Sequence, residues 1–191
     1  MPPTQRKRKT PAKSLATILA VLKKKGASEA KLLSPRDIVV DERVRLKCQV
    51  PLCDTYGRNL MCPPFLPSVG EFRQALALYE SSIIIQVSSG MEEIGGDWFL
   101  PARQLHELVN LGEKCAFDAG FRFALGLIGG CCRLCESCVA ADSGRTCRHP
   151  FKARPSMEAM GIDVQATAEK AGIPFNFPVR DKVVWTGLIL L

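Results

Sequence analysis

At residues 82–87 the sequence reads Ser-Ile-Ile-Ile-Gln-Val, an almost continuously apolar run of strand length that is rich in β-branched side chains. A strand with one face in water alternates apolar and polar residues, whereas a strand covered on both faces is apolar throughout. We therefore expect residues 82–87 to form a central strand of a sheet that is buried on both faces.

The segment after this run predicts a helix and a second strand. Residues 102–119 carry apolar or small side chains at intervals of three and four, which indicates a helix, and Gly120 ends it. Residues 121–128 form another apolar run of strand length. Because two strands joined by a helix usually form a parallel pair with a right-handed crossover, we expect such a pair here.

Weaker patterns on either side complete the predicted fold. Ser68 followed by Glu71 is the capping pattern of a helix start. We also expect short strands at 38–40 and 44–46, a short helix at 164–171 and a final strand at 182–191. The predicted class is α/β or α+β, with one small mixed sheet, packed helices, and cysteine-rich metal-binding loops at one end.

The N-terminal segment differs in composition from the rest. Residues 1–25 hold eight basic side chains and no acidic one, so the remaining chain is close to neutral. A short apolar stretch follows the first basic residues, but three lysines come next without a small-residue cleavage site, so we expect no secretion signal. We predict a basic, partly disordered segment over 1–26, with a short amphipathic helix capped by Ser14, and a single metal-binding domain over 27–191.

The chain has nine cysteines, and eight of them lie in two groups. The first group is Cys48, Cys53 and Cys62, and the second is Cys131, Cys132, Cys135, Cys138 and Cys147. The number of cysteines is odd, they are clustered, and no export signal is visible. These features favour thiolates that bind metal in a reducing compartment over disulfides. We therefore expect a metal-binding protein of the cytoplasm.

Spacing within the second group favours iron–sulfur over zinc. Cys132, Cys135 and Cys138 place a thiolate at every third residue, as in bacterial ferredoxins. Structural zinc more often takes two ligands from each of two separate places. Gly129 and Gly130 would also let the backbone approach inorganic sulfide. We expect a [4Fe-4S] site, with one or two clusters, and keep structural zinc as the alternative.

The number of ligands leaves the arrangement open. Two four-iron clusters need eight thiolates, and the two groups without Cys131 supply seven. Cys131 is a poor candidate for the eighth, because adjacent side chains point in different directions. Otherwise His149, a water molecule or a substrate would complete an open iron.

The pairing of the two groups is open as well. Each group could hold its own cluster. Alternatively Cys62, which precedes a proline as in two-cluster ferredoxins, could join residues 132, 135 and 138, while Cys147 joins residues 48 and 53. The sequence does not separate these arrangements.

Residues outside the two cysteine groups also have expected roles. Cys115 falls on the apolar face of the predicted helix 102–119 and is expected to be an inert core thiol. His106 falls outside that face and is expected at the surface. Five basic side chains around the second group would stabilise an anionic cluster or steer an acidic redox partner: Arg133, Arg145, Arg148, Lys152 and Arg154.

Three stretches resemble one known family: KCQVPLCDTYGRNLMCPP at 47–64, GGCCRLCESC at 129–138 and CRHPFKARPSMEAMGIDV at 147–164. They resemble the predicted metal-binding proteins of the domain-of-unknown-function family 2284, over roughly residues 36–191. The resemblance implies a cysteine-ligated metal, namely iron–sulfur, in the cytoplasm of bacteria and archaea. The ligands that it implies are Cys48, Cys53, Cys62, Cys132, Cys135, Cys138 and Cys147, whereas Cys115 and Cys131 are less essential to the pattern.

Three functions are compatible with the sequence. The first, which we favour, is an electron carrier or accessory redox protein that serves a partner protein. The second is an iron–sulfur enzyme with an open iron beside a pocket near Arg154, Met157 and Glu158. The third is a zinc-stabilised interaction module whose basic N-terminus binds nucleic acid. No apolar run approaches the length of a membrane span.

Overall fold

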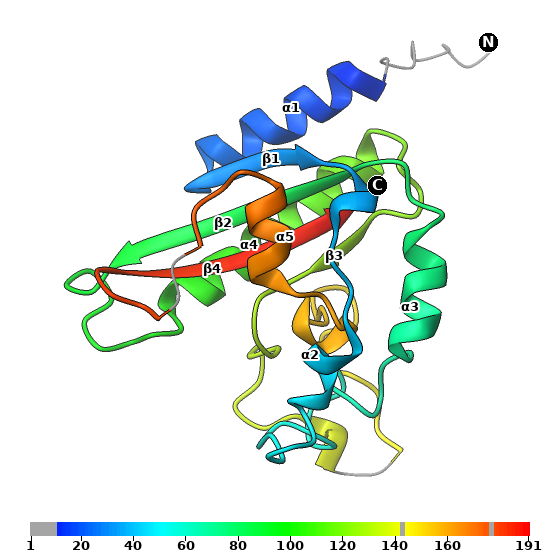
Figure 1. Ribbon diagram of the computed structural model, residues 1–191, viewed down its shortest axis with the longest axis vertical. Coiled ribbons are helices and arrows are strands. Elements are labelled where there is room, and N and C mark those ends of the chain that lie inside the picture. Colours follow the sequence, from blue (N-terminus) through cyan, green and yellow to red (C-terminus); the bar gives the residue numbers. More distant parts are fainter. Residues whose placement is uncertain (1–10, 142–143, 176–177) are drawn as a thin grey trace.

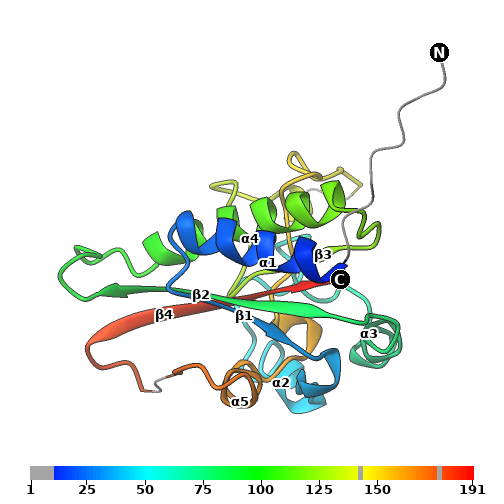
Figure 2. The same ribbon diagram turned by 90° about the horizontal axis from the view of Figure 1, so that it is seen from above.

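The computed structural model describes residues 11–141, 144–175 and 178–191. In this part of the chain four strands form one sheet in the order β1 (Glu29–Leu33), β2 (Ser82–Gly90), β4 (Lys182–Leu190) and β3 (Leu125–Leu127). Figure 2 shows α1 (Pro11–Lys24) and α4 (Leu100–Asp118) on one face of the sheet, and α2 (Glu42–Leu46) and α5 (Val164–Lys170) on the other. The fold class is α+β, in agreement with the prediction.

β2 is the central strand that the sequence predicts. It lies between β1 and β4, and its three isoleucines are fully buried. Ile83 and Ile85 belong to the core under α1 and α4, whereas Ile84 belongs to the core on the opposite face. Both cores are therefore built on one strand, because successive side chains of a strand point to opposite faces.

The expected parallel pair of strands is wrong. β4 lies between β2 and β3 and is antiparallel to both, with Gly187 opposite Ile85 and Leu188 opposite Leu127. The second half of β4 is buried on both faces, so this strand also needs a central position. β3 is reduced to three residues at the edge of the sheet.

The two short strands expected at 38–40 and 44–46 are also wrong. Residues 35–37 form a short 3-10 helix, Val40 makes only an isolated bridge to Ile162, and residues 42–46 are α2. The Asp41 side chain accepts a hydrogen bond of 2.8 Å from the backbone N–H of Arg43 and caps α2. This local cap outweighs the strand propensity of the valine and leucine that follow.

The predicted helices are present, with one change of boundary. α3 (Val69–Leu76) starts with the expected capping box of Ser68 and Glu71. α1 begins at Pro11, so Ser14 lies inside the helix instead of capping it, and its buried hydroxyl has no hydrogen-bond partner among the described residues. The apolar face of α1 packs into the core that α4 covers. Residues 1–10, which we expect to be disordered, lie outside the described residues.

None of the helices in the described part of the chain is both long and apolar enough to cross a membrane. Figure 1 shows the two cysteine-bearing segments together, below the sheet and away from α1, as the sequence predicts.

Gly187 lets α4 lie directly on the sheet. A β-carbon at this position of β4 would come within 2.8 Å of the Val109 side chain and within 2.9 Å of the Leu127 backbone oxygen. The backbone of the neighbouring strand cannot move aside as a flexible side chain can. The absence of a side chain here therefore fixes the distance between α4 and the sheet.

We expect Gly187→Ala to lower the free energy of unfolding by about 2 kcal/mol, because it overpacks the contact between α4 and β4. Denaturant titration measures the change. Gly70→Ala in α3 is the matched control, since its β-carbon would meet only Ser68 Oγ at 4.0 Å. The control should be neutral or stabilising by up to about 1 kcal/mol, because alanine is the better helix former. Equal losses in both variants would contradict the packing argument.

Candidate metal centre

The site is formed by two loops that meet below the sheet (Figure 1). The first cysteine loop, residues 47–68, joins α2 to α3, and the second, residues 129–155, leaves the sheet after β3. Asn59 connects them: its amide nitrogen donates to the carbonyl oxygen of Cys132 over 2.8 Å, and its amide oxygen accepts from the Met61 N–H over 3.0 Å. Asn59 is only 8% exposed, so the contact lies inside the pair of loops.

The second cysteine loop is closed at its base. Ile128, at the end of β3, forms a parallel bridge with Ser156. The Ile128 N–H donates to Pro155 over 3.0 Å, and the Met157 N–H donates back to Ile128 over 2.8 Å. The loop therefore starts and ends at adjacent points of the sheet.

The thiols of Cys48, Cys53, Cys62 and Cys131 form one set. The pKa of Cys62 is raised to about 11, chiefly by burial and also by the charges of the other three thiols, while the Thr55 hydroxyl acts in the opposite direction. Burial and then the charge of Cys53 raise the pKa of Cys48. The pKa of Cys131 is likewise raised by burial first and by Cys53 among its charged neighbours. Cys131 thus belongs electrostatically with the first group of the sequence.

Cys132 faces a different set of thiols. Burial raises its pKa, and the charges of Cys147 and Cys135 add to the effect. The same cavity of about 500 Å³ is lined by four cysteines of the second group, Cys131, Cys132, Cys135 and Cys138, and by Asp54, Thr55, Arg58 and Asn59 of the first cysteine loop. The structure therefore places Cys132 with Cys135, Cys138 and Cys147 and leaves Cys62 with the first set, while Cys131 borders both sets.

Hydrogen-bond donors lie next to the sulfur atoms of both sets. The Thr55 hydroxyl lies 3.3 Å from Cys53 Sγ, to which it can donate, and accepts from the Cys62 thiol over 3.6 Å. The Leu60 N–H donates to Cys138 Sγ over 3.5 Å, and the His149 N–H donates to Cys147 Sγ over 3.3 Å. Such donors stabilise a thiolate, because they place positive hydrogen atoms beside its charge.

His149 contacts the site through its backbone and not through its ring. It reaches Cys147 through its backbone, and its half-buried ring makes no hydrogen bond or ion pair with any of the described residues. Cys115 lies on α4 and packs against the main core, far along the chain from both loops, as expected for a core thiol.

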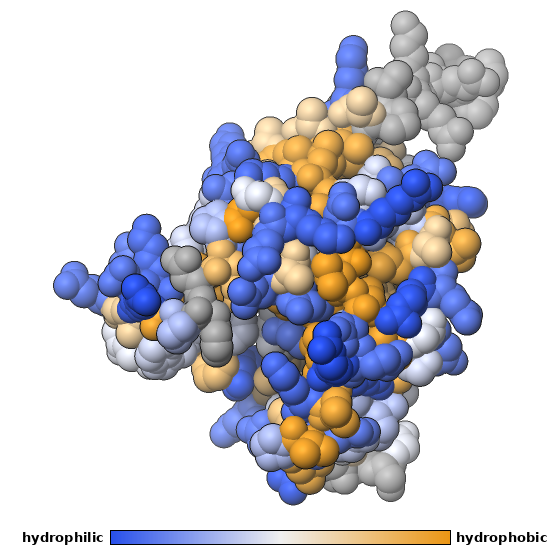
Figure 3. Space-filling view, in the orientation of Figure 1, coloured by the Kyte–Doolittle hydropathy of each residue, from blue (hydrophilic) through white to orange (hydrophobic). Residues whose placement is uncertain are grey.

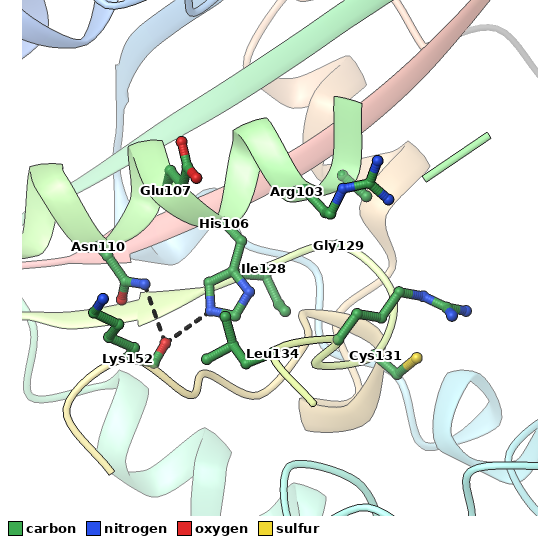
Figure 4. Close-up of a pocket in the computed structure, with 11 residues that line it drawn as sticks. Arg103, His106, Glu107, Asn110, Ile128, Gly129, Cys131, Leu134 and Lys152 are labelled. Carbon is green, nitrogen blue, oxygen red and sulfur yellow. Dashed lines mark hydrogen bonds between the residues drawn. The ribbon is translucent and has the colours of Figure 1, made fainter. Parts of the chain in front are cut away.

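One face of α4 holds the end of the second cysteine loop. His106 Nε2 and the Asn110 amide donate to the carbonyl oxygen of Lys152 over 2.8 and 3.1 Å (Figure 4). One turn further, Glu113 accepts two hydrogen bonds of 2.6 and 2.7 Å from the Arg154 guanidinium. Glu113 also accepts the Gly126 N–H over 2.6 Å, so it connects the loop to β3.

The expectation that His106 lies at the surface is wrong, since the residue is only 6% exposed. We name His106, Asn110 and Glu113 the polar stripe of α4. They follow one another at intervals of four and three residues, so they share one helix face. This second periodic pattern was available in the sequence, beside the apolar pattern that predicts the helix.

Gly129 and Gly130 have a role other than the predicted one. A β-carbon on Gly129 would lie 2.8 Å from the Thr186 backbone oxygen, and one on Gly130 would lie 2.7 Å from the Trp185 ring. The two glycines thus let the loop pass under Trp185 of β4. The Gly130 N–H points at the Glu158 carboxylate, at 3.3 Å, and not at a sulfur atom.

The residues expected beside a substrate pocket are structural. Arg154 is paired with Glu113, and Met157 is fully buried in the core on the α5 face of the sheet. Burial raises the pKa of Glu158, and hydrogen bonds from Ser156 and Gly130 act in the opposite direction. The basic residues of the loop are partly engaged too: Arg148 donates to the Ser137 carbonyl over 2.8 Å, and Arg133 stacks on the Phe99 ring at 3.5 Å.

The donor set suits a thiolate-bound metal. All nine cysteines are free thiols, and the eight loop cysteines supply soft sulfur ligands of the kind that iron–sulfur clusters and zinc prefer. Within the described residues, no three His, Cys, Asp or Glu side chains are close enough to hold a single metal ion.

The comparisons with known proteins agree with this donor set. No curated protein and no solved structure matches the chain. Residues 31–191 match a family described as predicted metal-binding protein (DUF2284), and this span includes both cysteine loops. The match covers well over half of the chain, so the chain belongs to the DUF2284 family of predicted metal-binding proteins.

Proposed function

We propose that the eight loop cysteines ligate two [4Fe-4S] clusters and that the protein carries electrons. One cluster would be held by Cys48, Cys53, Cys62 and Cys131, and the other by Cys132, Cys135, Cys138 and Cys147. The observation that carries the proposal is the placement of the thiols. Cys62 faces Cys48, Cys53 and Cys131, whereas Cys132 faces Cys135 and Cys147 and shares a cavity with Cys138. A four-iron cluster takes four thiolates, so each set has the required number.

Cys131, which directly precedes Cys132 in the chain, would supply the eighth ligand. Their side chains point in different directions, which prevents them from sharing one site but allows each to serve its own. The backbone directly after Cys132 is held by Asn59, whose amide nitrogen donates to the Cys132 carbonyl. The two proposed centres are thus joined through a single peptide bond, a short covalent connection for an electron.

A cluster supplies one-electron redox chemistry when it is bound. The protein would hold it between loops whose buried thiols and sulfur-directed donors control charge at the site. The lower end of the molecule also exposes apolar side chains next to charged ones, as Figure 3 shows. Leu46, Val50 and Leu52, at and after the end of α2, are 53%, 68% and 70% exposed. Exposed apolar groups of this kind suit contact with a redox partner protein, which we place with this chain in the reducing cytoplasm.

Metal and sulfide analysis after anaerobic purification tests the proposal. We expect brown protein with about eight iron atoms and as many acid-labile sulfides per chain. Cys131→Ser and Cys132→Ser should each lose about half of the iron, because each removes one ligand of a different set. Cys115→Ser is the matched control and should keep the wild-type content, since Cys115 lies on α4.

Two results would overturn the proposal. Colourless protein with stoichiometric zinc and no sulfide would leave a structural metal module, whose zinc would support folding alone. Iron that is unchanged in Cys131→Ser but lost in Cys132→Ser would leave a single cluster, held without Cys131.

The Thr55 hydroxyl provides a second test, through the reduction potential. A reduced centre is more negative than an oxidised one, so it gains more from a hydroxyl donor beside its ligands. We expect Thr55→Val to lower the midpoint potential by about 40 mV in a one-electron couple, which corresponds to a hydrogen bond of about 1 kcal/mol. Redox titration followed by visible spectroscopy measures it. Thr55→Ser keeps the hydroxyl and should retain the wild-type potential, so an equal shift in both variants would contradict the assignment.

A further inference from the structure

A pocket lies between α4 and the start of the second cysteine loop (Figure 4). Its volume is about 430 Å³, within the range of small-molecule sites. Ile128 and Gly129 supply apolar lining. Three basic residues, Arg103, Arg133 and Lys152, line the pocket together with His106 and one carboxylate, that of Glu107. The pocket thus combines an apolar wall with a few polar groups, as ligand sites do.

His106 presents a hydrogen-bond acceptor to this pocket. Its Nε2 atom lies 2.8 Å from the Lys152 carbonyl oxygen, which can only accept, so Nε2 carries the proton. In the neutral ring Nδ1 is then an acceptor, and Figure 4 shows it turned away from Lys152 toward the interior of the pocket. Burial lowers the pKa of His106 and favours this neutral form. No described residue donates to Nδ1, so a ligand can do so.

Arg133 presents the opposite chemistry. Its guanidinium carbon lies over the Phe99 ring, 3.5 Å from the ring centre, a contact that does not use the N–H groups as hydrogen-bond donors. Among the described residues no carboxylate forms an ion pair with it, whereas Arg103 is paired with Asp97 at 2.5 Å. An unpaired guanidinium held on an aromatic face suits a carboxylate, which it can bind through two parallel hydrogen bonds.

We propose that this pocket binds a small organic acid that also carries a hydroxyl or amino group. The carboxylate would lie against Arg133, the N–H or O–H group would donate to His106 Nδ1, and the carbon skeleton would contact Ile128 and Gly129. The inference does not depend on the metal, because it uses only side chains outside the two sets of thiols. Cys131 also lines the pocket, so a bound acid would lie beside the first set.

Two matched series of ligands test the proposal on the full chain as purified. L-Lactate and L-alanine differ from propionate by a single donor group, and L-malate and L-aspartate differ in the same way from succinate. Ligand-detected NMR titrations give the dissociation constants. In at least one series we expect the acids with a donor to bind about tenfold more tightly than the acid without one, as for one hydrogen bond to a buried acceptor.

Three variants separate the two contacts. His106→Leu removes the Nδ1 acceptor, and Asn110 still donates to the Lys152 carbonyl, so this variant should abolish the tenfold preference and leave the weaker acid unaffected. Arg133→Met should weaken all members of the series by about tenfold, because a charge-assisted contact is lost. Arg122→Met is the matched control, since Arg122 also lies over an aromatic ring, Phe123, but does not line the pocket.

The inference is overturned if neither series binds, or if binding shows no preference for the donor group. It is also overturned if Arg122→Met weakens binding as much as Arg133→Met, which would mean attraction to positive charge in general. Arg133 is exposed, so Arg133→Met is informative even if His106→Leu does not fold. Iron analysis is independent of these titrations, so failure of the pocket leaves the proposed clusters untouched.

Discussion

The fold and the site are connected by α4, which has to satisfy two surfaces at once. Its apolar face packs on the sheet and on α1, and its polar stripe holds the end of the second cysteine loop. The strongest single contact of the stripe is the ion pair of Glu113 with Arg154, in which both side chains are mostly buried. A buried charge without its partner is costly, so each of these residues requires the other. Glu113 also accepts the Gly126 N–H, so a displacement of the loop would also displace β3.

The loops themselves have little regular structure to hold them. Backbone groups that a helix or strand would satisfy are met one at a time, by Asn59, by Glu158 and by the sulfur atoms. Neighbouring thiols raise the pKa of Cys62 in one set and of Cys132 in the other, so removal of the protons without a bound cation would set like charges against each other. A metal that takes up those charges stabilises the loops, and the same loops then fix where the metal lies. The scaffold and the centre thus depend on each other.

The parts of the fold that the sequence predicts are those with strong local patterns. β2, α3 and α4 follow from apolar periodicity and from the Ser68 capping box, since these signals depend on near neighbours alone. The placement of β4 between β2 and β3 does not follow, because it depends on contacts between residues some hundred positions apart. For the site, cysteine spacing predicts the candidate ligands but not how they divide into two sets. Likewise the burial of His106 depends on a carbonyl group of the distant residue 152.

Cys131 illustrates why sequence spacing alone does not divide the cysteines into sets. Adjacent side chains point in different directions, and for a single centre this excludes one of two neighbouring cysteines. The same property favours a pair of neighbours when there are two centres, one on either side of the chain. Which case applies depends on whether other thiols lie on both sides of the chain. The sequence does not contain that information, but the folded chain does, since Cys53 lies near Cys131 and Cys147 lies near Cys132. In the proposed arrangement the pair Cys131–Cys132 joins the two sites, and neither cysteine is a surplus ligand.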